Sequence, residues 1–152
     1  MYRGANQLKV DGKGRVALPT RCRSELTERC GGSMVITVNN TKEHCLWMYP
    51  LDEWEKVEKK INDLPSFQPE HARLKRFFVG YASDVEMDKT GRILLPPSLR
   101  SFARIEKEIY FIGQGNKFEI WSAKDWEASC DSWINQEGEG DVPTPEMQVL
   151  QL

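Results

Sequence analysis

A short segment of this chain occurs twice, and this internal repeat limits the folds that the chain can adopt. Residues 11–26 and 88–103 align without a gap. The identical pairs are Asp11/Asp88, Gly14/Gly91, Arg15/Arg92, Leu18/Leu95, Pro19/Pro96, Arg23/Arg100 and Ser24/Ser101. Such a repeat indicates a duplicated structural unit, which presents the same local surface twice.

The size of the chain suits one domain or two small halves. It has 152 residues, of which 39% are hydrophobic. A small unit often needs a second copy to bury enough apolar surface, so we expect the halves to depend on each other.

The composition also bounds location and cofactors. No stretch approaches the roughly 20 apolar residues that cross a bilayer, and residues 1–5 do not look like a signal peptide. The four cysteines are widely spaced and form no C-x-x-C pair, which argues against a disulfide framework and against a zinc site. They are Cys22, Cys30, Cys45 and Cys130. We expect a soluble cytoplasmic protein without a metal or a membrane partner.

Each repeat opens with a predicted strand, turn and returning strand. Apolar residues alternate before each Asp and again after each Gly-Arg, which is typical of half-buried strands. These residues are Leu8, Val10, Val16 and Leu18 in the first copy and Val85, Met87, Ile93 and Leu95 in the second. Asp accepts backbone hydrogen bonds and Gly permits the turn conformation, so Asp-x-x-Gly-Arg predicts a tight hairpin turn.

Helices and a second strand pair follow in each copy. Pro19 and Pro96 close the returning strands and can occupy a first helical position, and short helices are expected over about residues 19–29 and 97–104. Strands are expected over 34–38, 46–49, 109–113 and 118–121, with further helices beginning near Pro50, Pro69 and Ser122. Trp54, Val57, Ile61 and Leu64 recur at helical spacing, which is typical of a core-facing helix.

This order predicts an α+β fold that is rich in β-structure. Two intertwined halves, over residues 1–79 and 80–136, would each be capped by helices. Residues 137–152 form an acidic tail that we expect to be flexible, because the segment is rich in acidic residues, Gly and Pro.

The sequence does not favour an enzyme. The two histidines, His44 and His71, lie outside the repeat. His44 is next to Cys45, but adjacent strand residues point to opposite faces, so they would not form a nucleophile–base pair. Gly12–Arg15 only superficially resembles a phosphate loop, because the longer loop and the trailing Lys-Ser/Thr are missing. No cofactor or small-molecule substrate is therefore expected.

A cationic cluster surrounds the first turn, although the whole chain has a net charge of -2. Its members are Arg3, Lys9, Lys13, Arg15, Arg21 and Arg23, and the window includes Gly14 and one acid, Asp11. Such a patch neutralises phosphates. A two-stranded ribbon fits the major groove, where an arginine such as Arg15 can bind a guanine edge with two hydrogen bonds. The cluster therefore suggests contact with double-stranded DNA.

Two alternatives remain open for the arginines of the turns. Arg15 and Arg92 could instead pair with Asp11 and Asp88 and stabilise the turns, and the two copies could differ. Acidic residues also surround the second cationic cluster. Its cations are Lys89, Arg92, Arg100 and Arg104, and the acids are Asp84, Glu86, Glu106 and Glu108. We expect the first copy to dominate DNA contact and the second to serve mainly assembly.

Several motifs in the same order resemble the MraZ family over residues 1–130. They are the paired Asp-x-x-x-Arg turns, Tyr2-Arg3-Gly4, Leu51-Asp52-Glu53-Trp54-Glu55 and the run from Gly113 to Trp121. The resemblance implies two tandem SpoVT-AbrB-type half-barrels of the swapped-hairpin kind in one pseudo-two-fold unit. It also implies a closed homo-oligomeric ring.

The resemblance further implies a function. MraZ proteins are bacterial transcriptional regulators, associated with the nucleoid, that bind short direct repeats upstream of the division and cell-wall gene cluster. The family turns map to Asp11, Gly14 and Arg15 and to Asp88, Gly91 and Arg92, and Gly12 stands where many relatives have Ser. We expect a repressor; the alternative is a ring-forming protein-interaction module whose DNA contact is incidental.

Overall fold

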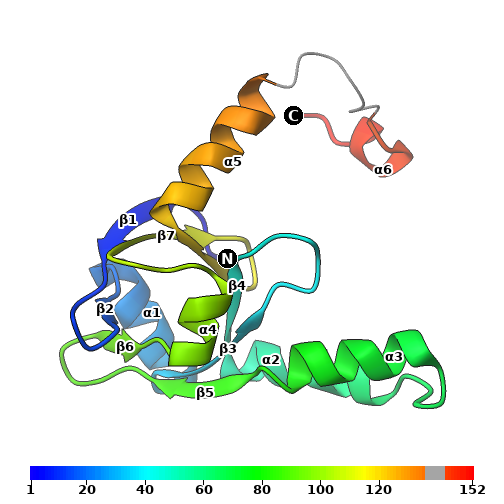
Figure 1. The fold of residues 1–152 in the computed structure, drawn as a ribbon, viewed down its shortest axis with the longest axis horizontal. Helices are drawn as coiled ribbons and strands as arrows, with labels where there is room; N and C mark the ends of the chain where they lie inside the picture. Colours follow the sequence, from blue (N-terminus) through cyan, green and yellow to red (C-terminus); the bar gives the residue numbers. More distant parts are fainter. Residues whose placement is uncertain (136–142) are drawn as a thin grey trace.

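Both repeats contain the same series of elements in the computed structural model, which describes residues 1–135 and 143–152 (Figure 1). The first repeat comprises β1 (Ala5–Lys9), β2 (Arg15–Ala17), α1 (Thr20–Cys30), β3 (Ser33–Val38), β4 (Leu46–Pro50) and α2 (Leu51–Asn62). The second comprises β5 (Ser83–Glu86), β6 (Arg92–Leu94), α4 (Pro97–Phe102), β7 (Glu108–Gly113), β8 (Phe118–Ser122) and α5 (Ala123–Asn135). The predicted element order and the α+β class are confirmed.

One sheet is built from both repeats. Its six strands run in the order β1-β7-β8-β4-β3-β5, and exchanging the two repeats leaves this order unchanged. β4 and β8 lie side by side at the centre, where Trp47 is opposite Glu119. The first strand of each repeat pairs with the third strand of the other: β1 pairs with β7, and β5 pairs with β3.

The expected hairpins are wrong in their pairing, although the turns form. After the first turn, a single bridge between Val10 and Val16 joins the two arms. β2 instead pairs with β6 of the other repeat, with Val16 opposite Ile93. Both side chains are buried almost completely in this arrangement, and β1 pairs with β7 of the other repeat.

The main core lies between the sheet and the β2–β6 pair and draws on both repeats. The apolar residues of the duplicated motif, Val16, Leu18, Ile93 and Leu95, are each at most 1% exposed. Leu26 of α1 and Leu99 of α4 also belong to this core. Because one apolar cluster contains residues of both copies, neither repeat has this core by itself.

A second apolar cluster joins the helices after β4 to the sheet. Trp54 and Ile61 of α2 are buried against Val35 and Tyr49, as their helical spacing predicted. α3 (Pro69–Leu74) begins at Pro69 as expected and continues as a π-helical turn, η1 (Lys75–Val79). This turn buries Phe78 in the same cluster.

The helix starts differ in detail from expectation. Pro19 and Pro96 precede α1 and α4 as N-cap residues, so the prediction that they occupy the first helical position is wrong by one residue. Ser122 behaves as predicted, because its Oγ accepts a hydrogen bond from the Asp125 amide at 3.1 Å.

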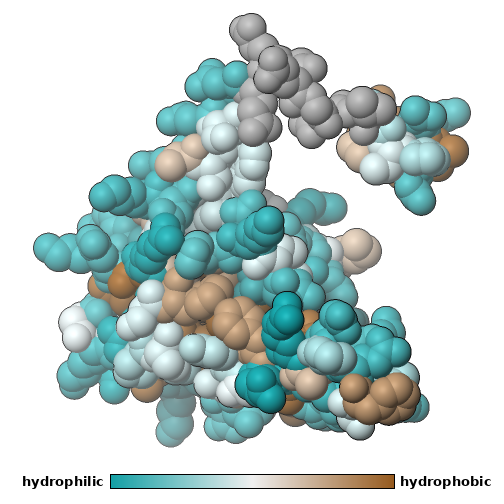
Figure 2. All heavy atoms as spheres, turned by 45° about the vertical axis from the view of Figure 1, so that its right-hand side comes forward, coloured by the Kyte–Doolittle hydropathy of each residue, from teal (hydrophilic) through white to brown (hydrophobic). Residues whose placement is uncertain are grey.

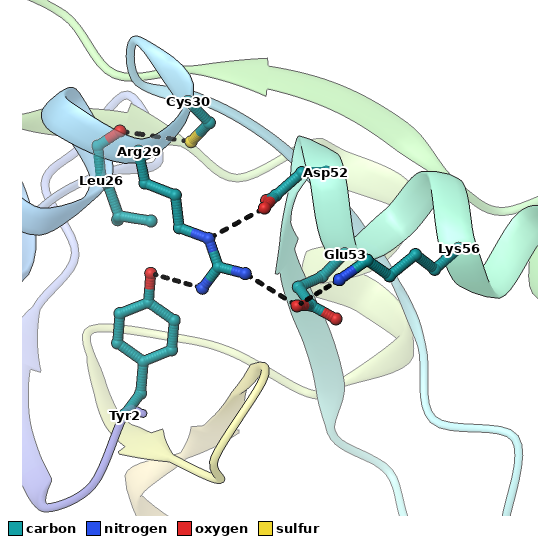
Figure 3. A network of polar contacts seen from close by, with 7 residues as sticks. All are labelled: Tyr2, Leu26, Arg29, Cys30, Asp52, Glu53 and Lys56. Atoms are coloured by element: carbon teal, nitrogen blue, oxygen red, sulfur yellow. Dashed lines mark hydrogen bonds and ion pairs between the residues drawn. The ribbon is translucent and has the colours of Figure 1, made fainter.

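An ion-pair network joins the end of α1 to the start of α2 (Figure 3). The Arg29 guanidinium donates to Asp52 Oδ2 at 3.0 Å and to Glu53 Oε1 at 2.7 Å, and its third nitrogen lies 3.5 Å from the Tyr2 hydroxyl. Lys56 also donates to Glu53 Oε1, at 3.2 Å. The network holds the first helix, the second helix and the N-terminal segment together.

The remaining expectations concern the tail and membranes. Residues 137–142 of the expected flexible tail lie outside the described residues. Beyond them, Pro145–Gln148 form a short helix, α6. Within residues 1–135 and 143–152, no helix is long and apolar enough to span a membrane.

Candidate nucleic-acid interface

The first turn is held by the carboxylate at its start. Oδ1 of Asp11 accepts hydrogen bonds from the Lys13 amide at 2.9 Å and the Arg15 amide at 2.8 Å. The hydrogen bond from Arg15 is the main reason that the pKa of Asp11 is lowered. Gly14 has a φ of 82°, which side-chain-bearing residues rarely adopt. The turn is therefore ordered before any partner binds.

The second turn repeats this arrangement with one more donor. Oδ1 of Asp88 accepts from the Arg92 amide at 2.9 Å and from both the amide and the hydroxyl of Thr90, at 2.9 and 2.8 Å. These hydrogen bonds, that of the Arg92 amide first, lower the pKa of Asp88 to about 2. Gly91 has a φ of 78°.

The two copies differ in the arginine side chain. Arg92 Nε donates to Asp88 Oδ2 at 3.1 Å. In the part of the chain that the structure describes, Arg15 makes no such ion pair. Of the two copies, the second therefore forms the ion pair that the sequence left open, and among the described residues the first does not.

The β2–β6 pair presents a polar and an apolar residue from each strand on its outer face. Arg15 lies opposite Leu94, and Ala17 lies opposite Arg92, while Val16 and Ile93 point into the core between them. Leu94 is 51% exposed. A two-stranded ribbon of this kind can enter the major groove, where an arginine can contact guanine and an apolar group the thymine methyl.

The other predicted DNA-binding residues lie in different places. Lys13 is exposed in the first turn, whereas Lys9 is exposed on the edge strand β1 opposite Glu108, and Arg3 is exposed just before this strand. Arg21 is exposed on α1 and lies 3.4 Å from Glu25. The structure therefore brings only Lys13, Gly14 and Arg15 together at the ribbon.

Arg23 is half-buried and donates to the Leu18 carbonyl at 2.6 Å. Its side chain packs against Gly91 of the second turn rather than beside Arg15. Arg100 makes the equivalent contact with Gly14. The sequence placed Arg100 in the second cationic cluster but predicted no contact of it with the first turn, and it did not single out Leu94. The match of Arg100 with Arg23 in the repeat was a signal for the former.

The surface hollows offer little chemistry. One hollow has a volume of about 550 Å³ and mixes cations such as Arg104 and Lys124 with acids such as Glu106 and Asp125. A hollow of about 370 Å³ beside the second turn is lined by Arg23, Asp88 and Lys89 among others. Neither holds a recognisable set of catalytic groups.

The His44–Cys45 pair does not form a catalytic site. Cys45 is fully buried, and its burial raises the pKa of the thiol to about 12, so the reactive thiolate is not formed near neutral pH. His44 is exposed, and its Nδ1 lies 3.3 Å from the Phe102 carbonyl. The four cysteines are free thiols, and the described residues contain no His/Cys/Asp/Glu group that could hold a metal ion.

Comparison with known proteins finds close relatives over the whole chain. The family model described as "MraZ protein, putative antitoxin-like" matches residues 1–77 and again residues 78–138. Proteins named "Transcriptional regulator MraZ" from Marinomonas sp. (strain MWYL1) and Halorhodospira halophila are 45% and 44% identical, over 100% of each chain. The protein of that name from Pseudomonas syringae pv. tomato is 46% identical over 87% of each chain. These names are those of regulators and not of enzymes, as the sequence predicted.

Proposed function

Because the chain belongs to the MraZ family, we propose that it is a transcriptional regulator that binds double-stranded promoter DNA in a sequence-specific manner. The observation that carries this proposal concerns the outer face of the β2–β6 ribbon. There Arg15 makes no salt bridge with any described residue, and Asp11 holds the adjoining turn in place. The backbone of an ordered turn loses little conformational freedom when it binds, which favours specific recognition.

Within this proposal, Lys13, Gly14 and Arg15 form the DNA-reading segment. Lys13 supplies a phosphate contact and Arg15 a contact to a base edge. Arg3, Lys9 and Arg21 contribute positive charge around the segment, which attracts DNA without selecting its sequence. Arg23, Asp11, Asp88, Gly91 and Arg92 serve the architecture of the turns.

We further propose a repressor that binds short direct repeats upstream of the division and cell-wall gene cluster, in the cytoplasm at the nucleoid. The organisation proposed for it is two SpoVT-AbrB-like half-barrels of the swapped-hairpin kind, over residues 1–79 and 80–136, and an acidic tail over 137–152. The reciprocal pairing of β1 with β7 and of β5 with β3 supports this organisation.

The proposed assembly is a closed ring of identical subunits. Figure 2 shows a patch of hydrophobic side chains in the middle of one face, beside the α2–α3 region. Among the exposed aromatic residues, Phe77 and Tyr81 are each 40% exposed and pack against each other and Phe102. Apolar area of this kind on a surface supports self-association. A ring would bring several reading segments to neighbouring repeats and so strengthen a weak single contact.

One experiment tests the proposal against the alternative of a protein-interaction module. The full chain is footprinted on the DNA upstream of its own gene and on a scrambled fragment of equal composition, and its mass is measured in solution. Protection of regularly spaced sites in the first fragment only, together with a multi-subunit mass, supports the regulator. A multi-subunit mass with equal and weak binding to both fragments would instead favour the interaction module.

A further inference from the structure

Two equivalent arginines cross from one repeat to the turn of the other. Arg100 of α4 lies over Gly14, so closely that a Cβ built on this glycine would be 2.8 Å from the guanidinium carbon. Arg23 of α1 lies over Gly91 in the same way. Each turn is thus covered by a side chain that the other repeat supplies.

Both arginines are fixed by backbone carbonyl groups. Arg100 Nε donates to the Leu95 carbonyl at 3.0 Å, and Arg23 Nε donates to the Leu18 carbonyl at 2.6 Å. The same leucines hold the glycines, because the Leu95 amide donates to the Gly14 carbonyl and the Leu18 amide to the Gly91 carbonyl, both at 2.9 Å. Leucine, arginine and glycine therefore form one connected unit at each turn.

The unit at Gly14 adds to the support that Asp11 gives the first turn. Asp11 binds the amides of Lys13 and Arg15 through its carboxylate and the Gly14 amide through its carbonyl oxygen at 3.0 Å. The Gly14 carbonyl accepts from the Leu95 amide, and the atoms nearest to a Cβ built on Gly14 belong to Arg100. Gly14 directly precedes Arg15, so a shift of Gly14 changes the direction in which Arg15 points.

On this geometry, and resting on the proposed DNA contact of Arg15, we propose that Arg100 is a positioning residue for DNA binding. The second repeat acts on DNA recognition through Arg100, which holds the first turn, and not through its own Arg92. Arg23 has the matching role at the second turn, so it is not a DNA contact even though it belongs to the first cationic cluster by sequence.

The test compares two charge-conserving variants, Arg100→Lys and Arg23→Lys. Lysine keeps the positive charge and can still bind a phosphate, but it lacks the planar group that covers the glycine. Binding of each full-length variant to the upstream fragment is measured between about 50 and 200 mM salt, the range over which phosphate contacts strongly alter affinity. Hydrogen exchange of the Gly14, Arg15, Gly91 and Arg92 amides is measured in parallel.

We expect Arg100→Lys to weaken binding by about tenfold with an unchanged salt slope, since one charge-assisted hydrogen bond in the support of the turn is lost. Hydrogen exchange of the Gly14 and Arg15 amides should be faster in this variant than in the wild type. Arg23→Lys should bind DNA as the wild type does, while its exchange accelerates at Gly91 and Arg92. This second variant shows that loosening a turn as such does not abolish binding.

Three outcomes would overturn the positioning role of Arg100. The first is that Arg100→Lys binds DNA with wild-type affinity, and the second is that Arg23→Lys loses as much affinity as Arg100→Lys. The third is that the salt slope of Arg100→Ala is lower than that of the wild type by about one, which marks a direct phosphate contact. Arg15→Ala in the same assay separates the possible failures. Loss of binding with Arg15→Ala but not with Arg100→Lys rejects only the positioning role, whereas no loss with Arg15→Ala rejects the proposed function and this role with it.

Discussion

Arg92 donates a hydrogen bond from Nε to Oδ2 of Asp88 over 3.1 Å, and so closes its own turn. Both partners are 39% exposed, so the pair contributes little to stability by itself. Its consequence is functional, because an arginine that is bound to its own aspartate is less available to a base edge than Arg15, which makes no equivalent pair among the described residues.

The first prediction compares the two arginines. Arg15→Ala should weaken binding to the upstream DNA by about ten- to a hundredfold, the range expected for one good contact to a base edge. Arg92→Ala should change the affinity less, because Arg92 is engaged with Asp88. Titration of labelled DNA with each variant measures both constants. An equal loss in the two variants would mean that both turns read DNA.

The second prediction concerns the glycines of the first turn. Gly14→Ala should lower the free energy of unfolding by about 1–2 kcal/mol, because alanine is strained at positive φ. Its new methyl group would also meet Arg100. Gly12→Ala is the matched control in the same turn, since a Cβ there meets nothing within 4 Å. Urea denaturation of the two variants checks the difference, and equal stabilities would refute it.

The third prediction is a pH dependence. The pKa of Asp88 is lowered from 3.8 to about 2, so its ionised form is favoured by folding. The stability that it contributes is complete above pH ~4 and is lost as the pH falls toward ~2. Asp88→Asn cannot titrate but keeps an acceptor oxygen, so its stability should fall less steeply over this interval. Denaturant unfolding at pH values from 5 to 2.5 measures both slopes, and parallel slopes would contradict the assignment.

The fourth prediction concerns the network of Arg29 (Figure 3). Arg29→Met should reduce the free energy of unfolding by about 1 kcal/mol, because it removes hydrogen bonds to two carboxylates while keeping most of the stem. The control is Arg21→Met, which removes one exposed pair with Glu25 at 3.4 Å and should change stability by less than about 0.5 kcal/mol. Thermal unfolding at low and high salt should show that only the Arg29 variant differs clearly from the wild type.

The sequence by itself determined the local features of this protein. Asp11 and Asp88 with Gly14 and Gly91 specify the turns, because a carboxylate three residues before a glycine can bind the amides on both sides of that glycine without help from distant residues. Helical spacing in the same way placed Trp54 and Ile61 in the core. The repeat and the family motifs also sufficed to predict a duplicated α+β fold.

Only the tertiary structure decided which strands pair and which arginine is available. β2 could have paired with β1 along its whole length. Apart from the single Val10–Val16 bridge, it pairs instead with β6, where Val16 is buried opposite Ile93, since pairing across the repeats covers more apolar surface than two separate hairpins would. The same exchange carries Arg23 away from the predicted cationic cluster and brings Arg100 to Gly14. Local patterns describe the hydrogen bonds that a segment can make, whereas the choice among distant partners depends on the burial of the whole chain.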